Sequence, residues 1–397
     1  MKEETPRANR FYIGLFGRRN SGKSSLVNAL TGQDTAIVSD VPGTTTDAVQ
    51  KNMELPGIGA AVIVDTAGYD DEGGLGTLRV ERTRKMARKM DLALLVVSGM
   101  PDEAESERRW LACFESEEIP VIAVCNKMDT APDGELQAWE RKLGRTLCAV
   151  SAMDGRGLDV LRDAMAAVYK RYDDLDDLTG TLVGEGDTVL LVMPQDLQAP
   201  KGRLILPQVQ TLRNLLDKHC LVHCCTAESL PAMLAALQSP PTLIITDSQV
   251  FPAVEAQCPP ATRLTSFSVL FARQKGDIRS FVDGADALRR LRPDARVLIA
   301  EACTHVPLHE DIGRVKLPRL LRKRFGDRLS IDIVSGNDFP EDLSGYDLVI
   351  HCGACMFTRR HVMSRLRQAR VQHVPMTNYG VAIACLTGIL DKVVYPD

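Results

Sequence analysis

The sequence predicts an α/β fold with mainly parallel sheets, arranged in three units. Apolar runs of strand length alternate along the chain with stretches of helical periodicity, which is the pattern of repeated βαβ units. An acidic stretch of linker character, DDLDD at Asp173–Asp177, interrupts this alternation. We expect a first unit over residues 1–172, followed by two smaller α/β units over residues 173–266 and 267–397.

The composition is that of an ordinary globular protein. Of the 397 residues, 45% are hydrophobic and 25% charged, and the net charge of −4 gives no global attraction to nucleic acid or to an anionic membrane. The N-terminal stretch MKEETPRANR lacks the apolar core of a secretory signal, and no apolar run reaches the roughly 18 residues of a membrane span. We expect a cytoplasmic protein whose 11 cysteines are core residues or metal ligands rather than disulfides.

The first unit opens with a phosphate-binding pattern. The apolar strand Phe11–Phe16 leads into GRRNSGKSS and then into a helical repeat, so the glycine loop lies between a strand and a helix. The glycines let backbone N–H groups turn toward the phosphates, Lys23 reaches the β- and γ-phosphates, and the Ser24 hydroxyl ligates Mg²⁺. The expected phosphate-side residues are Gly17, Asn20, Ser21, Gly22, Lys23, Ser24 and Ser25.

Later motifs follow in the order that a GTPase requires. DTAG ends one strand, where the Asp65 carboxylate can hold the Mg²⁺ shell and the Gly68 N–H can meet the γ-phosphate. NKMD ends another strand, and Asp129 can accept hydrogen bonds from guanine N1 and N2 groups that adenine does not offer. The predicted nucleotide is therefore GTP, and the expected base-side residues are Asn126, Lys127, Asp129, Ser151 and Ala152.

With PGTTTD at Pro42–Asp47, these motifs resemble the translation-factor-class GTPases that carry PGTTxD in their first switch. The resemblance implies that Thr45 senses Mg²⁺ and that Asn20 ligates a K⁺ ion, which supplies the positive charge of an arginine finger. A plain turn residue is the alternative for Asn20. Tyr69 stands after DTAG in place of a glutamine, so we expect slow intrinsic hydrolysis, stimulated by potassium. The expected catalytic set is Lys23, Thr45, Asp65 and Gly68.

The middle unit shows strands and helices but no phosphate loop and no catalytic pairing. Its expected strands are Val189–Met193, Leu221–Cys224 and Leu243–Thr246. Cys224 and Cys225 are adjacent on a strand and face opposite ways, which favours core roles for both, and for Cys220, over a metal site. A small α/β unit without chemistry of its own is a candidate subunit interface.

The third unit places cysteines after two of its strands. The expected strands are Arg296–Ala300, Ser330–Val334, Asp347–Ile350 and His373–Met376. Because the carboxyl ends of parallel strands share one edge, Cys303 of ACTH should meet Cys352 and Cys355 of HCGAC, with Gly353 allowing a tight turn. Three thiols suit either a zinc ion, with His305 or His351 as fourth ligand, or a [4Fe–4S] cluster, and the spacing leaves both open.

A P-loop GTPase motif followed by a middle α/β unit, ACTH and HCGAC resembles the [FeFe]-hydrogenase maturation GTPases of the HydF family over nearly the whole chain. The resemblance implies that Cys303, Cys352 and Cys355 ligate a [4Fe–4S] cluster, with His305 and His351 as a fourth ligand or as neighbours. It implies a scaffold that receives a diiron precursor from radical SAM maturases and delivers it to apo-[FeFe]-hydrogenase. The middle unit would then form a homodimer.

Basic residues crowd helices near the predicted cysteine site. Solvated helix faces are one interpretation, and attraction of the anionic, cyanide-bearing precursor or of an acidic partner is the other. We also expect Asn378 and Tyr379 to face the site from the end of a third strand. The basic residues are Arg319, Arg322, Lys323, Arg324, Arg359, Arg360, Arg365, Arg367 and Arg370.

The alternative function is a GTPase that acts on RNA or the ribosome and carries a structural zinc site in its last unit. The sequence shows no stacked-aromatic RNA motif, and aromatic residues make up 5% of it. We therefore expect no nucleic-acid partner.

Overall fold

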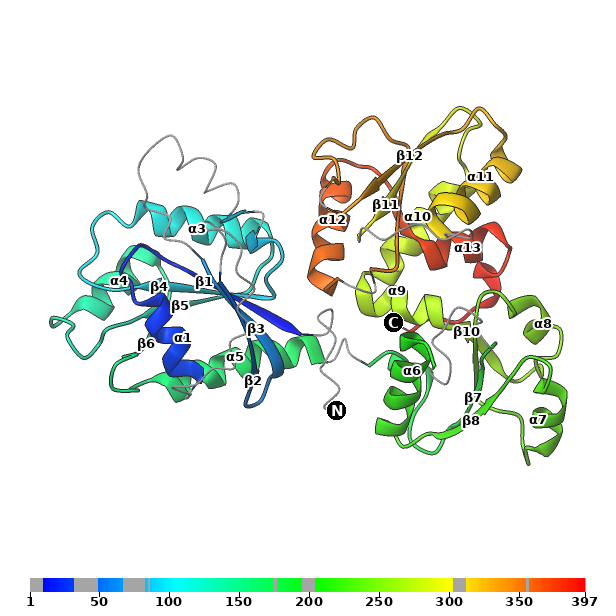
Figure 1. Ribbon diagram of the computed structural model, residues 1–397, viewed down its shortest axis with the longest axis horizontal. Helices are drawn as coiled ribbons and strands as arrows, with labels where there is room; N and C mark the ends of the chain where they lie inside the picture. Colours follow the sequence, from blue (N-terminus) through cyan, green and yellow to red (C-terminus); the bar gives the residue numbers. More distant parts are fainter. Residues whose placement is uncertain are drawn as a thin grey trace. The chain divides into compact units, whose positions relative to one another are not determined.

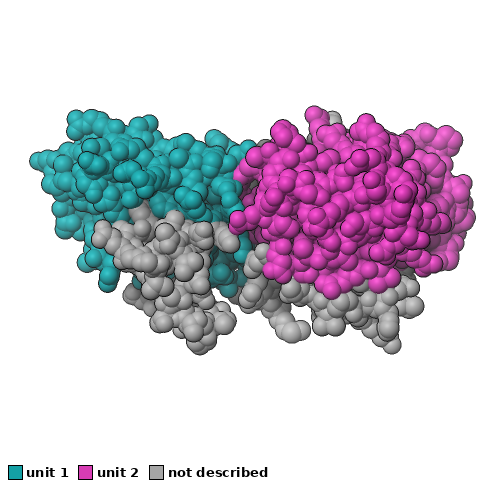
Figure 2. Space-filling model, turned by 90° about the horizontal axis from the view of Figure 1, so that it is seen from above, with its two compact units in different colours: residues 1–174 teal, residues 175–397 magenta. Residues whose placement is uncertain are grey.

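The computed structural model describes residues 10–31, 49–66, 83–84, 86–173, 177–194, 204–302, 312–336, 338–354 and 357–396. The chain divides into two compact units, Met1–Asp174 and Leu175–Asp397 (Figures 1 and 2). The first unit holds one sheet and the second holds two, and parallel pairing dominates in all of them, so the predicted α/β class is confirmed. The boundaries at residues 172 and 266 stay predictions.

In the described part of the first unit, six strands form one sheet in the order β2-β3-β1-β4-β5-β6. β2 runs antiparallel to β3, and the other neighbours pair in parallel. The strands are β1 (Phe11–Phe16), β2 (Val49–Leu55), β3 (Gly59–Asp65), β4 (Leu92–Val97), β5 (Val121–Cys125) and β6 (Cys148–Ala149).

Helices cover both faces of this sheet (Figure 1). On one face, Leu26 and Leu161 pack from two helices against Ile13 of β1. On the other face, Phe114 packs against Phe16 with ring centroids 4.9 Å apart. A central strand buried on both faces reads as a continuous apolar run, which explains LALLVV in β4. The helices are α1 (Lys23–Thr31), α3 (Glu105–Ser116), α4 (Glu135–Leu143) and α5 (Leu158–Asp173).

The second unit contains two four-stranded parallel sheets within its described residues. Their strand orders are β10-β9-β7-β8 and β12-β11-β13-β14. The first sheet consists of β7 (Thr188–Val192), β8 (Leu221–Cys225), β9 (Leu243–Thr246) and β10 (Arg263–Ser266). The second consists of β11 (Arg296–Glu301), β12 (Ser330–Ser335), β13 (Leu348–His351) and β14 (Met376–Asn378).

One continuous apolar core joins these two sheets. Ile244 of β9 and Ile299 of β11 belong to the same group of buried side chains, together with Val269 and Phe281 from the helices between them. The longer helices of this unit are α6 (Leu206–Asp217), α9 (Phe267–Lys275), α10 (Ile278–Arg289), α11 (Leu317–Phe325), α12 (Arg359–Val371) and α13 (Tyr379–Leu386). The shorter elements are η2 (Gly180–Leu182), α7 (Leu230–Ala236), α8 (Phe251–Glu255), the π-helix η3 (Ile312–Lys316) and η4 (Leu390–Lys392).

The last predicted strand lies in a different place from the one expected. The prediction was His373–Met376, whereas β14 spans Met376–Asn378. The cause is the end of α12, where His373 adopts a left-handed φ of 58° and the Val374 N–H bonds to the Ala369 carbonyl. The chain is still closing the helix at these residues, so strand pairing begins only at Met376.

β8 lies at the edge of its sheet and is less buried than the sequence predicted. Among the described strands it pairs with β7 alone, and its Leu221 side chain is 58% exposed. Cys224 is exposed, so the core role predicted for it is wrong, because an edge strand has a neighbour on one side only. Cys220 is buried as expected. No helix in the described part of the chain has the length and apolarity to cross a bilayer.

We expect Gly284→Ala to destabilise the protein. Gly284 lies in α10 against β14, and a Cβ added to it would fall 2.3 Å from the Met376 carbonyl oxygen. Overpacking of this kind costs about 1–3 kcal/mol, which exceeds the better helix propensity of alanine. Thermal and urea unfolding of the whole chain measure the effect. Gly184→Ala, where a Cβ meets open space, is the matched control, and equal midpoints for the two variants would contradict the prediction.

Candidate functional site

The phosphate loop lies where the sequence predicted it, between β1 and α1. Lys23 is buried, and its Nζ donates hydrogen bonds of 2.9 Å to the carbonyl oxygens of Gly17 and Arg18. Gly22 has a φ of 85°, and a Cβ there would lie 2.3 Å from the Asn126 side-chain nitrogen. The loop therefore closes tightly around its own lysine, and no larger residue fits at position 22.

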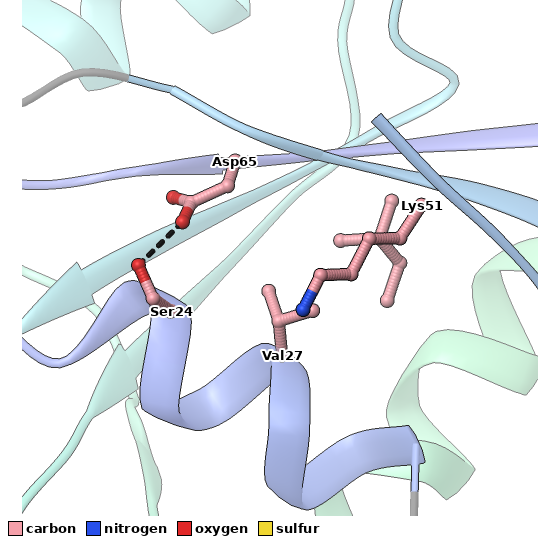
Figure 3. A pocket seen from close by; sticks show the side chains of 5 residues that line it. Ser24, Val27, Lys51 and Asp65 are labelled. Carbon is pink, nitrogen blue, oxygen red and sulfur yellow. Dashed lines mark hydrogen bonds between the residues drawn. The ribbon is translucent and has the colours of Figure 1, made fainter. Parts of the chain in front are cut away.

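The Mg²⁺ side of the site brings Ser24 and Asp65 together. The Ser24 hydroxyl, in the first turn of α1, donates a 2.5 Å hydrogen bond to the Asp65 carboxylate at the end of β3 (Figure 3). A cavity of about 200 Å³ lies beside them, lined also by Val27, Lys51 and Ile63. A hydroxyl and a carboxylate that meet at one point are the oxygen ligands that Mg²⁺ prefers.

One buried amide joins the phosphate loop to the base-binding loops. Asn126 is 1% exposed, and its side-chain NH₂ donates to the carbonyl oxygens of Ser21, at 3.1 Å, and Gly22, at 3.3 Å. Its Oδ1 accepts from the Ala152 N–H at 3.2 Å. The buried Ser151 hydroxyl in turn donates to Asp129 at 2.8 Å. Four of the predicted base-side residues are therefore connected, since Ser151 and Ala152 are neighbours in the chain: Asn126, Ala152, Ser151 and Asp129.

The remaining predicted residues of the phosphate and base sides differ in exposure. Asn20 is exposed and adopts a φ of 62°, Ser21 is buried, and Ser25 and Lys127 are exposed. Thr45 and Gly68, predicted for the two switches, lie outside the described residues.

Arg18 is a part of this site that sequence reasoning missed. Its Nε donates to the buried Glu107 carboxylate at 2.6 Å, and its Nη1 donates to Asp102 at 2.6 Å. The guanidinium holds the pKa of Asp102 well below its usual range through hydrogen bonds. The two carboxylates lie 84 and 89 residues away in the sequence, so no local pattern pointed to them.

The second candidate site lies at the carboxyl ends of β11 and β13. These strands pair in parallel, with Ala300 opposite His351. The Ala302 N–H donates a 3.0 Å hydrogen bond to the Cys352 sulfur. Cys352 thus contacts the residue that precedes Cys303 in the chain. Cys303, His305 and Cys355 lie outside the described residues.

The turn within HCGAC is made at a different residue from the one predicted. Ala354 carries the left-handed φ, 50°, and Gly353 does not. A Cβ added to Gly353 would meet nothing within 4 Å. The expectation that Gly353 supplies the tight turn is therefore wrong, and the strained position falls on the residue just before Cys355.

Both ring nitrogens of His351 are engaged. Its Nδ1–H donates to the Cys352 carbonyl oxygen at 2.7 Å, and its Nε2 accepts from the Arg365 guanidinium at 2.9 Å. The ring is fully buried, and this burial, together with the Arg365 charge, lowers the pKa of His351 to about 3. His351 is therefore neutral and fixed in one tautomer.

Two buried charged groups lie at this edge: Arg365, which was expected among the basic residues near the cysteines, and Glu301, which the sequence did not single out. Arg365 is 5% exposed, and burial lowers its pKa to about 10. Glu301, the last residue of β11, is 2% exposed and accepts from Arg314 at 3.0 Å and from the Ser335 hydroxyl at 3.2 Å. Buried charges at strand ends leave no signal in hydrophobic periodicity.

The basic residues of α12 are not a solvated face. Arg359 donates to the carbonyl oxygens of Arg273, at 2.6 Å, and Gln274, at 3.0 Å, near the end of α9, and Arg360 is 8% exposed. The solvated interpretation is wrong for Arg360 and Arg365, because this helix packs inside the unit. On α11, by contrast, the cationic side chains are exposed and form no ion pair with any residue that the structure describes: Arg319, Arg322, Lys323 and Arg324.

Asn378 caps a helix. Its Oδ1 accepts from the Val381 N–H at 2.8 Å, at the start of α13, and the residue is 5% exposed. Across β13 and β14 it stands opposite His351, and its position facing the cysteine site stays a prediction. Tyr379 lies closer to the site, since a Cβ added to Gly313 would meet its phenol oxygen at 2.0 Å and Glu301 at 2.8 Å. Within the described residues, no group of three or more metal-ligating side chains is present.

Known proteins match the chain in three segments. The family model of the 50S ribosome-binding GTPases matches residues 12–127. The hydrogen maturase F dimerization domain matches residues 178–276, and the hydrogen maturase F tetramerization domain matches residues 279–396. The last two matches together cover more than half of the chain, and domains of this description indicate an oligomer.

Curated relatives match the GTPase part alone. GTPase Der of Wolinella succinogenes is 35% identical over 43% of this chain and 38% of its own length. The tRNA modification GTPase MnmE of Geobacillus thermodenitrificans is 37% identical over 39% of this chain and 33% of its own length. The match therefore spans well under half of either relative.

A solved structure described as a probable GTP-binding protein engB covers 40% of this chain and 99% of that chain, with 22% identity and a TM-score of 0.31, a likeness too low to support an argument. The family models carry the identification. The chain belongs to the hydrogen maturase F family and carries a GTPase domain in its first unit.

Proposed function

We propose that this GTPase is a cytoplasmic scaffold and carrier for [FeFe]-hydrogenase maturation. It binds a [4Fe–4S] cluster, receives a diiron precursor as cargo from radical SAM maturases, and delivers that cargo to apo-[FeFe]-hydrogenase. The observation that carries the proposal is the 3.0 Å hydrogen bond from the Ala302 N–H to the Cys352 sulfur, because it joins the two cysteine-bearing strand ends.

The donor set fits an iron–sulfur cluster. Cys303 directly follows Ala302, and Cys355 follows the turn at Ala354, so Cys303, Cys352 and Cys355 would hold the cluster. Backbone N–H groups that donate to cysteine sulfur are a common device for tuning such clusters. Three thiolates leave one iron with an exchangeable position, which a scaffold needs in order to take up and release a second metal assembly.

The two histidines would have different roles. Both nitrogens of His351 are bonded, so His351 orients the Cys352 loop as a neighbour of the cluster. The fourth iron position is then left to His305 or to an exchangeable ligand. Tautomer-fixing contacts of this kind are typical of residues that support metal ligands.

The GTPase unit would hydrolyse GTP slowly and with the help of potassium. Ser24, Asp65 and Thr45 would hold Mg²⁺, and Lys23 with the Gly68 N–H would contact the phosphates. Asn20 would hold K⁺ beside them, in the exposed rim position that the loop gives it. Asn126 links this phosphate side to the guanine side through Ser21, Gly22 and Ala152, so nucleotide binding would stiffen both together.

The edge strand β8 would form the homodimer contact. An unpaired edge with apolar side chains is a template for pairing with a second copy. Leu221 of β8 is 58% exposed, and from the neighbouring α6 Leu216 is 53% exposed and Val209 46%. These residues fall within the segment that matches the dimerization domain.

The exposed cations of α11 would guide the acidic surface of the partner hydrogenase toward the cluster. They follow η3 directly and carry no intramolecular ion pair within the described residues. Clustered exposed charge of one sign raises association rates and does so most at low salt.

The first test is anaerobic reconstitution with iron and sulfide, followed by absorption and EPR spectra. We expect a [4Fe–4S] signal in the wild-type protein and loss of most bound iron in Cys352→Ser, because one thiolate ligand is removed. Cys113→Ser, a half-buried thiol of α3, is the matched control and should keep the cluster. A colourless, zinc-loaded wild-type protein would instead support a structural zinc site.

The second test compares GTP hydrolysis in potassium and in sodium. We expect rates at least about tenfold higher in potassium, since the ion replaces the charge of an arginine finger, and loss of that difference in Asn20→Ala. Asn28→Ala, in the second turn of α1, should keep it. Equal wild-type rates in the two salts would leave Asn20 as a plain turn residue.

The third test reverses charge on α11. We expect the double variant Arg322→Glu and Lys323→Glu to activate apo-hydrogenase about tenfold more slowly at low salt, with a smaller effect at high salt. Cluster content and GTP hydrolysis should not change. The control reverses Arg141 and Lys142, which are exposed on α4. Equal activation by both double variants would show that α11 is not the docking helix.

A further inference from the structure

A buried arginine that has no carboxylate partner among the described residues lies beneath the cysteine site. Arg365 is 5% exposed, and its guanidinium donates to His351 Nε2 at 2.9 Å and, more weakly, to the Glu301 carbonyl oxygen at 3.5 Å. It also donates to the Gly336 carbonyl oxygen and lies 4.6 Å from the centre of the Phe339 ring. Every one of these partners is neutral, and no carboxylate among the residues that the structure describes contacts it.

Such an arrangement is unfavourable without a compensating negative charge. Transfer of an ion from water into a protein interior carries a large desolvation cost, so buried charges in proteins are paired or bound to metals. Neutral acceptors and an aromatic face offset part of the cost. The nearest buried carboxylate on the same strand end, Glu301, is already bonded to Arg314 and to the Ser335 hydroxyl.

The contacts of Arg365 lead toward Cys352, whose thiolate can supply negative charge. Arg365 bonds to His351, and His351 donates through Nδ1 to the Cys352 carbonyl oxygen at 2.7 Å. The Cys352 sulfur itself accepts the Ala302 N–H. The chain of hydrogen bonds that begins at the guanidinium therefore ends on the backbone carbonyl of Cys352, which places the cation close to the residue that carries the thiol.

We propose that Arg365 is the counter-cation of a thiolate-ligated cluster at this site and that its charge sets the reduction potential of that cluster. This inference rests on the proposed function. A [4Fe–4S] cluster held by cysteine thiolates carries net negative charge, and one-electron reduction makes it more negative. A fixed buried cation stabilises the reduced form more than the oxidised form, so it raises the potential. His351 positions the guanidinium and transmits no proton.

The experiment is a redox titration with dithionite, monitored by EPR, on the reconstituted full chain. In Arg365→Met, we expect the ratio of reduced to oxidised cluster at a fixed potential to fall at least tenfold, which equals about 59 mV for a one-electron couple. Methionine fills a similar volume and removes the charge together with the hydrogen bonds to His351 and Gly336, which is why the lysine variant is compared with it. In Arg365→Lys, which keeps the charge, the ratio should stay within about twofold of the wild type.

The matched control removes the same charge from the surface of the same helix. Arg370 of α12 is 63% exposed, and its ion pair with Asp277 is screened by water. Arg370→Met should change the ratio less than about twofold. A shift in Arg365→Met no larger than that of Arg370→Met overturns the proposal, and so does an equal shift in Arg365→Lys, which would assign the effect to shape rather than charge.

If the reconstituted wild-type protein forms no cluster, the proposed function is wrong. Its absorption and EPR spectra show this before any variant is compared. If Arg365→Met takes up no iron, thermal unfolding of the cluster-free proteins distinguishes a counter-cation from a purely structural arginine. A variant as stable as the cluster-free wild type supports a counter-cation, since replacement of an unpaired buried charge by an apolar side chain is then neutral or stabilising. A variant that unfolds at a lower temperature shows a structural role and overturns the proposal.

Discussion

The parallel pairing of β11 with β13 is the constraint on which the second unit depends. Because Ala300 stands opposite His351, both strands end at the same level, and the chain that leaves them must start from adjacent points. The Ala302 N–H then reaches the Cys352 sulfur without any further rearrangement. The same pairing places the His351 ring inside the sheet edge, where Arg365 from α12 meets it. Backbone register therefore positions the thiol, the imidazole and the cation together.

In the first unit, a side chain rather than strand register brings the loops of the site together. Its phosphate and base loops follow different strands, and the amide of Asn126 ties them by donating to Ser21 and Gly22 and accepting from Ala152. Arg18 anchors the other side of the phosphate loop to Asp102 and Glu107. A loop held from both sides keeps its N–H groups oriented before the nucleotide arrives, which reduces the entropy lost on binding. The two sites are therefore preorganised by different means, one by register and one by buried hydrogen bonds.

The strands and motifs that the sequence predicted correctly are those that a local sequence pattern determines. Strand runs such as FYIGLF, the phosphate loop after them and the order of DTAG and NKMD follow from periodicity and motif spacing, and the structure has the corresponding strands in β1, β3 and β5. The errors arose where tertiary context decides. His373 closes α12 in a left-handed conformation, Ala354 rather than Gly353 makes the turn, and Cys224 falls on an edge strand. Thr45, Gly68, Cys303, His305 and Cys355 remain predictions, because they lie outside the described residues.

The arginine-rich helices α11 and α12 show that composition alone does not reveal what a charged side chain does. α11 and α12 are both rich in cations, and no sequence pattern distinguishes their charged residues. In the structure, α12 packs into the unit, so Arg360 and Arg365 are buried, and Arg359 is bonded to carbonyl groups at the end of α9. α11 turns its cations outward. A buried cation acts on its immediate neighbours through a low dielectric, whereas exposed cations act on approaching molecules through screened, long-range attraction. We therefore propose different roles for the same residue type in the two helices, short-range in α12 and long-range in α11.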